Sequence, residues 1–260
     1  MVLQAVPFVT FVVLLLVERV RPLRRTTASR WRRACVNVGV AVFGGLLFAA
    51  SYQAFLLPCA RWGEVHGYGL LRWIRLPLPH FVRAVASFAL LDYTLWVWHR
   101  LNHRVGFLWR FHGAHHADVD LDVSTAVRFH FGELLLSVPY RMMQVLIIGV
   151  DFPILVAWEG TLAVMTQMHH SNVRLPLALE RIVRCFFITP RLHGIHHSVE
   201  ERHRSSNFGT MLSVWDFVHA THAWDVPQAD IKIGIPEVTA SQGFTEVLAW
   251  PFTSRAKKRS

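Results

Sequence analysis

The stretch HRLNHRVGFLWRFHGAHH, residues 99–116, is rich in histidine and follows a strongly apolar segment, and a second stretch, HGIHH, occupies residues 193–197. Spacings of three and four residues place side chains on one face of a helix. Several neutral imidazoles that converge from one direction suit iron, zinc or copper. The candidate ligands in these two stretches are His99, His103, His112, His115, His116, His193, His196 and His197.

The composition indicates a membrane protein. The chain of 260 residues is 53% hydrophobic and 17% charged, whereas soluble domains contain roughly 25% charged residues. We therefore expect an all-α integral membrane bundle of about four to five apolar helices, in two hairpins, with a cytosolic helical cap that holds the histidine groups. The apolar segments are Val2–Val17, Ala34–Leu57, Phe81–Trp98, Leu134–Val150 and Phe152–Met168.

The basic residues flank apolar segments. Seven arginines lie between residues 18 and 33, and the chain ends in RAKKRS. This placement favours a membrane topology signal over nucleic-acid binding, although the net charge is +10. With residues 18–33 in the cytoplasm, every histidine group falls on the cytoplasmic face. We expect a multi-pass protein with its site on that face, in the inner membrane if the source is bacterial. The mixed segment 61–79 is then expected to lie on the opposite side as an interfacial loop.

Three cysteines, Cys35, Cys59 and Cys185, form no CxxC pair. They imply neither a disulfide framework nor a thiolate metal site, and we expect them to be small buried apolar residues.

Further polar residues lie near the histidine groups. Asp92 stands inside an apolar segment, two helical turns before His99, where its carboxylate could orient a ligand imidazole or form a structural hydrogen bond. Asn207 follows the last group and could hydrogen-bond into the site. His130 is a candidate ligand or a neighbour of ligands. Of the adjacent pair His169 and His170, we expect one to be a ligand. His219 and His222 are expected at the surface, and His66 and His80 in interfacial or structural positions.

The order HRxxH, HxxHH, HSN and HxxHHS followed by NFG resembles the fatty acid hydroxylase / sterol desaturase superfamily, from about Glu18 to Asp216. The resemblance implies an integral membrane oxygenase with a histidine-held di-iron centre that uses O2 and reducing equivalents to hydroxylate or desaturate lipids. RFHFGE resembles the family's RFHPxE, with Phe131 in place of proline. HAT at 219–221 departs from the family pattern. The implied ligands are His99, His103, His112, His115, His116, His170, His193, His196 and His197, with His130 added by RFHFGE.

The implied partners are a lipid, the membrane and a separate electron donor. The chain has no CxxC iron–sulfur spacing and no GxGxxG flavin motif, so we expect a ferredoxin or a cytochrome-type donor. Desaturation of a sterol or acyl lipid remains open beside hydroxylation. A metal transporter would need ligands along a path through the bilayer, where only Asp92 and Glu159 lie. A zinc hydrolase would use three ligands, and HExxH is absent.

We expect three regions along the chain. Residues 1–80 are an N-terminal membrane hairpin with an interfacial loop, residues 81–225 a catalytic domain of the fatty acid hydroxylase type, and residues 226–260 a C-terminal tail.

Overall fold

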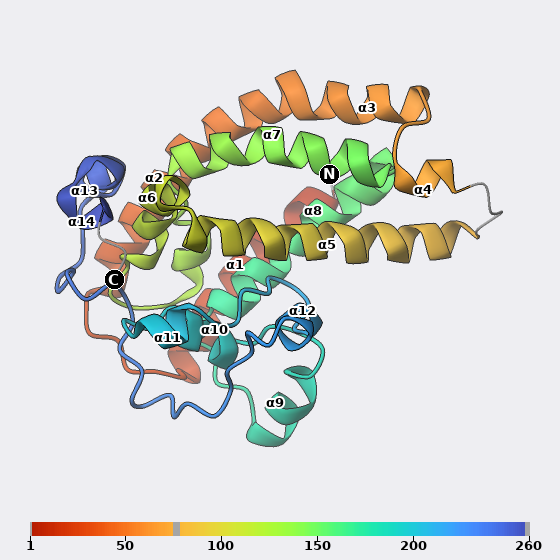
Figure 1. Ribbon diagram of the computed structural model, residues 1–260. Coiled ribbons are helices and arrows are strands. Elements are labelled where there is room, and N and C mark those ends of the chain that lie inside the picture. The colour runs from red at the N-terminus through yellow and green to blue at the C-terminus, as the bar shows by residue number, and fades with distance from the viewer. Residues whose placement is uncertain (1, 75–78, 258–260) are drawn as a thin grey trace.

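The computed structural model describes residues 2–74 and 79–257, and over these residues the protein is helical (Figure 1). The expected all-α class is confirmed. The described residues contain no strand, and only three isolated β-bridges join loop segments.

Long helices form the body of the molecule, and Figure 1 shows α7 running alongside the continuous path of α2 and α3, above α5. A single turn of π-helix, η1, joins α2 to α3 without a break in the helical path. The elements are α1 (Val2–Val20), α2 (Arg30–Ser51), η1 (Tyr52–Leu56), α3 (Leu57–Val65), α5 (His80–Arg104), α7 (Phe131–Ile148) and α8 (Phe152–His170).

Three segments of the described chain are long and apolar enough to cross a membrane: Arg30–Trp73, His80–Arg104 and Phe131–Ile148. The protein is therefore an integral membrane protein. The predicted segments near α1 and α8 also form helices, but both helices fall outside this set.

The segment expected as a loop over residues 61–79 is partly helical. Helix α3 continues to Val65, and a turn leads into α4 (Leu70–Trp73), while residues 75–78 lie outside the described part. The turn meets the end of α7 at two glycines with positive φ, Gly69 (111°) and Gly149 (79°). A Cβ on Gly69 would lie 2.3 Å from the Gly149 Cα, so neither backbone leaves room for a side chain.

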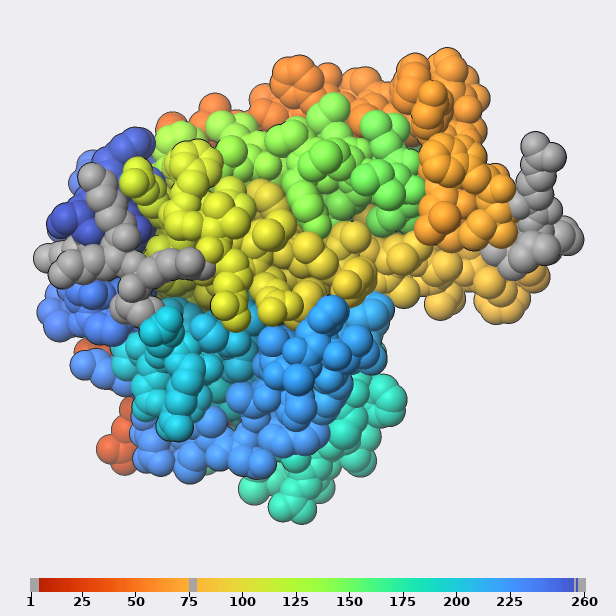
Figure 2. All heavy atoms as spheres, in the orientation of Figure 1, coloured from red at the N-terminus to blue at the C-terminus, as the bar shows by residue number. Residues whose placement is uncertain are grey.

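Short helices cover one end of this body. They are α6 (Gly106–His116), η2 (Val123–Val127), α9 (Leu177–Val183), α10 (Pro190–His196), α11 (Glu201–Arg204), α12 (Val214–Val218), α13 (Phe244–Ala249), η3 (Trp250–Phe252) and α14 (Ser254–Lys257). Figure 2 shows the chain after α9 packed closely along the yellow α5. The segment that we expected as a tail contains α13, η3 and α14. Its Val247 and Trp250 are buried in a cluster with Trp109 of α6.

A buried ionic network joins the start of α2 to the loop after α6. The Arg33 guanidinium donates to the carboxylates of Asp118 and Asp122, and all three side chains are nearly inaccessible. Asn37, one turn further along α2, donates to Asp118 at 3.1 Å. Two of the seven arginines between residues 18 and 33, Arg24 and Arg33, have buried side chains.

The expectation of buried cysteines is wrong. Cys35 and Cys185 are exposed and Cys59 is half-buried. Cys35 lies on a membrane helix, where an outward face meets lipid, so an apolar side chain gains little from turning inward.

Candidate metal centre

Nine histidines meet at one end of the bundle and form two adjacent clusters, eight of them on four helices and His197 directly after α10. Within each cluster the candidate ligand nitrogens lie within 4.8 Å of one another. Cluster A contains His99, His103, His112, His116 and His196, and cluster B contains His115, His170, His193 and His197. These nine are the ligands that the family resemblance implies.

Helix ends bring the nine side chains together. Helix α5 ends at Arg104, and α6 starts two residues later, so the chain turns back and both HRLNH and HGAHH face inward. Helix α8 ends at His170. Helix α10 begins where the Thr189 hydroxyl accepts a hydrogen bond from the backbone N–H of Leu192, with Pro190 in the first turn.

Backbone carbonyls select the tautomer of several ligands. A carbonyl oxygen only accepts, so an Nδ1 atom within hydrogen-bond distance of one carries the proton. His99 donates from Nδ1 to the Phe208 carbonyl at 2.8 Å, and His196 donates to the Ser206 carbonyl at 2.7 Å. His170 donates to the Thr166 carbonyl at 2.8 Å. In each case Nε2 is left with a free lone pair.

These lone pairs face other ring nitrogens. The Nε2 atoms of His99 and His196 are 3.0 Å apart, although both rings already carry their proton on Nδ1. His170 Nε2 lies 2.9 Å from His193 Nε2 and 3.0 Å from His115 Nε2. Two lone pairs repel unless a cation lies between them. Ligand nitrogens about 2.0–2.1 Å from a shared ion would be separated by about 3 Å, so these residues fit a metal.

Burial keeps the imidazoles neutral. For His115, His116, His193, His196 and His197, desolvation is the main cause that lowers the pKa well below the ordinary 6.5. Charge on neighbouring histidines lowers it further. Neutral imidazole is the form that binds a metal, so the clusters are ready to bind at neutral pH.

Glu133 supports the site, and the sequence analysis did not select it. Its Oε1 accepts a hydrogen bond at 2.9 Å from Nδ1 of His112, and both side chains are buried. A carboxylate behind a ligand imidazole fixes the ring and raises its basicity. The available signal was the glutamate of RFHFGE, which lies in the first turn of α7.

His130, which we considered as a ligand, lies outside both clusters. It is the N-cap of α7: Nδ1 accepts from the backbone N–H of Gly132 at 3.0 Å. Its Nε2 lies 3.1 Å from the Leu248 carbonyl, to which it donates. Both ring nitrogens are therefore engaged, and neither is free to bind a metal.

The structure also places the expected Asp92 and Asn207 away from the ligand rings. Asp92 Oδ2 accepts from the Leu212 N–H at 3.1 Å and from Trp215 Nε1 at 2.8 Å, which anchors the loop before α12. Asn207, with φ of 52°, donates from Nδ2 to the Leu192 and Ala223 carbonyls.

Asp216 organises the loop that serves His99. This buried carboxylate accepts hydrogen bonds from the backbone N–H groups of Phe208 and Gly209 at 2.9 and 2.8 Å. The same loop presents the Phe208 carbonyl to His99. Asp216 thus positions the candidate ligand His99 through the backbone of this loop. In the sequence, Asp216 appeared only as the last residue of the family resemblance, with no role assigned to it.

The other histidines stay outside the clusters. His169 lies beside them, with its ring centroid 4.1 Å from that of His193 and its Nδ1 2.9 Å from the Thr210 carbonyl. Of the pair at the end of α8, His170 is the one in a cluster. His219 is half-buried and stacks on Trp96. The exposed side chains are those of His66, His80 and His222.

A cavity of about 150 Å³ reaches the clusters from between α5, α7 and α8. Helices α5, α7 and α8 each contribute to its walls, which combine apolar side chains such as Leu95 and Leu162 with histidines of both clusters. Arg141 also lines it and forms an ion pair with Glu159 of α8. A hydrocarbon group in this cavity would lie against the clustered imidazoles.

The comparisons agree with this site. The family described as fatty acid hydroxylase matches residues 84–221. Ornithine lipid hydroxylase OlsE of Rhizobium tropici is 32% identical over 184 residues, which are 69% of this chain and 53% of that protein. Cholesterol 25-hydroxylase of Homo sapiens is 26% identical over 201 residues, 67% and 69% of the two chains. Alkylglycerol monooxygenase of Homo sapiens is 25% identical over 136 residues, 52% and 29%. No solved structure matches.

The fold and the site together define a helical membrane protein with two histidine clusters that could hold metal ions. The chain belongs to the fatty acid hydroxylase family. It spans about half the length of the ornithine lipid hydroxylase that it matches.

Proposed function

We propose that this protein hydroxylates an unactivated C–H bond of a membrane lipid, with O2 as co-substrate, at a di-iron centre held by nine histidines. The observation that carries the proposal is that imidazole nitrogens of different histidines face one another in clusters A and B. Both clusters lie at the end of a cavity between α5, α7 and α8. An all-nitrogen ligand set of this kind suits iron.

The chain's own residues hold the ligand imidazoles in the orientation that metal binding needs. When bound, the iron ions supply the activation of O2 that acid and base side chains lack. Glu133 holds the ring of His112, and the carbonyls of Phe208 and Ser206 hold those of His99 and His196. Each partner keeps the proton on Nδ1, so Nε2 stays available to a metal.

The cavity supports a lipid substrate that enters from the bilayer. It lies between α5, α7 and α8, two of which are candidate membrane spans. The three relatives are named for hydroxylation or monooxygenation of an ornithine lipid, cholesterol and an alkylglycerol. These names favour hydroxylation over desaturation for this chain as well.

The arginine-rich segment 18–33 favours a cytoplasmic position for the site, in the inner membrane if the source is bacterial. Electrons come from a separate ferredoxin or cytochrome-type donor, which can reach a site on that face.

The test is iron content per chain after anaerobic reconstitution of detergent-purified protein with ferrous iron. We expect two irons in the wild type, loss in His116→Ala and His197→Ala, and full retention in His222→Ala, whose side chain is exposed. Mass spectrometry of lipids incubated with ¹⁸O2 and a chemical reductant should then show one added labelled oxygen. Retention of iron in both cluster variants would contradict the assignment, and an alkene product would indicate desaturation.

A further inference from the structure

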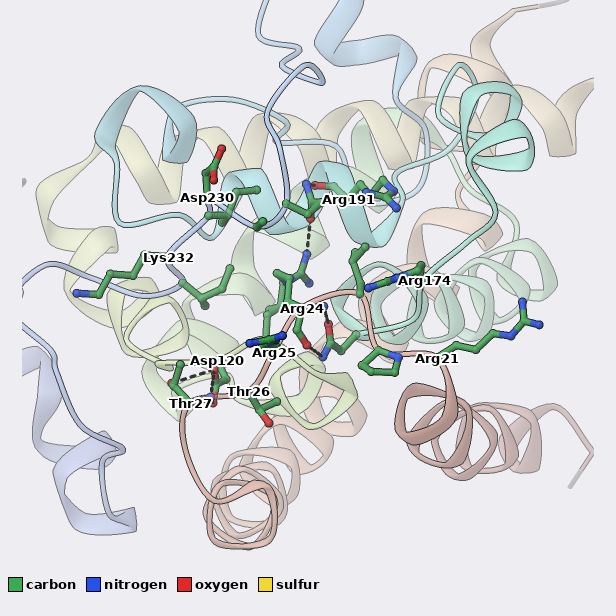
Figure 3. A pocket seen from close by; sticks show the side chains of 18 of the residues that line it. Arg21, Arg24, Arg25, Thr26, Thr27, Asp120, Arg174, Arg191, Asp230 and Lys232 are labelled. Carbon is green, nitrogen blue, oxygen red and sulfur yellow. Dashed lines mark hydrogen bonds between the residues drawn. The ribbon is translucent and has the colours of Figure 1, made fainter.

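A second, larger cavity lies outside the histidine clusters. It has a volume of about 1760 Å³ and is formed by the loop after α1, the segment between α8 and α9, and residues 228–233 (Figure 3). Ligand cavities in proteins are typically roughly 300–1,000 Å³. This cavity can therefore hold a charged group together with the molecule that carries it.

The walls of this cavity are strongly basic. Only two carboxylates line it, and one of them, Asp120, already accepts hydrogen bonds from the backbone N–H groups of Thr27 and Ala28. Among the described residues, the only wall cation in an ion pair is Arg191, 3.8 Å from Glu180. The cations are Arg21, Arg24, Arg25, Arg30, Arg174, Arg191 and Lys232.

Arg24 lies at the centre of the cavity wall and is only 8% exposed (Figure 3). Its Nη1 donates to the Pro190 carbonyl at 3.2 Å and to Gln228 Oε1 at 2.7 Å. Its Nε and Nη2 have no hydrogen-bond partner in the described structure. A buried donor without a partner is costly, and more so when it is charged. Burial, with the nearby charge of Arg191, also lowers the pKa of Arg24 to about 10.

The surrounding chain holds Arg24 in this position. Asn172 accepts from the Arg24 backbone N–H at 2.9 Å and donates to its carbonyl at 2.8 Å. A Cβ at residue 194 would lie 2.2 Å from Arg24 Nη1, so Gly194 provides the space for the guanidinium. The arrangement is thus built by the two segments that also carry His170 and His193.

The edge of the cavity next to α1 is apolar. Val20 and Leu177 line it and are 81% and 61% exposed. The outward face of α1 continues this surface with Phe8 and Leu16, 72% and 54% exposed. In an integral membrane protein, such a surface faces lipid chains, and basic residues at its end lie at the depth of the headgroups.

We propose that this basic cavity is a binding site for a phosphate group, carried by a membrane lipid or by a soluble phosphorylated molecule. Arg24 lines the cavity, and a planar guanidinium matches two phosphate oxygens. The surrounding arginines and Lys232 neutralise the remaining charge. The apolar edge beside α1 favours a lipid as the source.

The test measures binding of phosphate probes to the iron-loaded full chain. Native mass spectrometry of protein released from nanodiscs of phosphatidylcholine with phosphatidic acid reports the lipid arm. Calorimetry with inorganic phosphate and pyrophosphate in neutral detergent reports the soluble arm. The variants are Arg24→Gln, the exposed pair Arg174→Gln with Lys232→Gln, and the control Arg181→Gln, an exposed arginine outside the cavity. Polyglutamate serves as the probe for an acidic protein surface.

We expect saturable binding of a phosphate probe, weakened about tenfold or more in Arg24→Gln and in the double variant and unchanged in Arg181→Gln. Arg24 contacts α10, so the double variant keeps the test valid if Arg24→Gln fails to fold. Binding of phosphatidic acid would identify a lipid as the source of the phosphate, and binding of inorganic phosphate or pyrophosphate would identify a soluble molecule. No saturable phosphate binding, equal binding by all variants, or binding of polyglutamate alone would overturn the proposal.

Discussion

The Glu133 Oε1 atom lies 2.9 Å from His112 Nδ1, and this contact links the first turn of α7 to the helix that carries HGAHH. It joins a membrane helix to the metal centre through one buried hydrogen bond. The orientation of His112 thus depends on where α7 begins.

Replacement of Glu133 with Gln should weaken iron binding. The neutral amide still fills the space but no longer stabilises the His112 ring by charge, and such changes cost about 10–100-fold in metal affinity. Competition with a ferrous chelator measures the apparent Kd, with the exposed Glu201→Gln as the control. An unchanged Kd in Glu133→Gln would show that the contact does not tune the metal.

His130 should matter for stability rather than for metal binding. His130→Ala removes the N-cap of α7, which costs about 1 kcal/mol, and should leave iron content unchanged. His130→Asn retains a capping acceptor and should recover most of the lost Tm. His170→Ala, by contrast, should lose iron. Loss of iron in both His130 variants, with normal folding, would instead make His130 a ligand.

The metal-free protein should lose stability as the pH falls below about 6.5. Burial lowers the pKa of the folded His116 and His197, so below 6.5 the unfolded chain binds more protons than the folded chain. Stability is therefore fully present above 6.5 and declines towards the lower folded pKa. The pKa of Asp118 is also lowered, by Arg33, but from 3.8, so its contribution is lost only in stronger acid. Melting scans from pH 8 to 5 measure the effect, and a flat Tm over this range would contradict it.

The buried pair of Arg33 and Asp118 should be essential for folding. Arg33→Ala leaves the two buried carboxylates without their ion-pair partner, which costs about 3–5 kcal/mol. Its exposed neighbour provides the control, and Arg32→Ala should change the free energy of unfolding by less than about 0.5 kcal/mol. Unfolding in mixed micelles measures both variants. Equal stability of the two would show that the network adds nothing.

Filling the membrane-side cavity should block turnover without loss of iron. Ser137 lines the cavity from α7, and Ser137→Phe would occupy much of its volume of about 150 Å³. Met143, on the same helix, is 53% exposed, so Met143→Phe tests the same residue change outside the cavity. We expect at least a roughly tenfold fall in product for Ser137→Phe only. Normal turnover in Ser137→Phe would show that the substrate does not occupy this cavity.

The sequence by itself determined the helical membrane class and the nine clustered histidines. Helical spacing and apolar length are local properties, and HGAHH and HGIHH place ligands on one face whatever surrounds them. The family resemblance then ordered these groups into one site.

The tertiary structure decided what supports the ligands. His130 caps a helix because its ring lies between Gly132 and Leu248. Asp92 accepts a hydrogen bond from Trp215 because α12 packs against α5. The Glu133 contact and the basic cavity around Arg24 join residues far apart in the chain. Such contacts are determined by packing and by the cost of burying an unpaired charge. Contacts between residues far apart in the chain produce no periodic pattern or fixed spacing in the sequence.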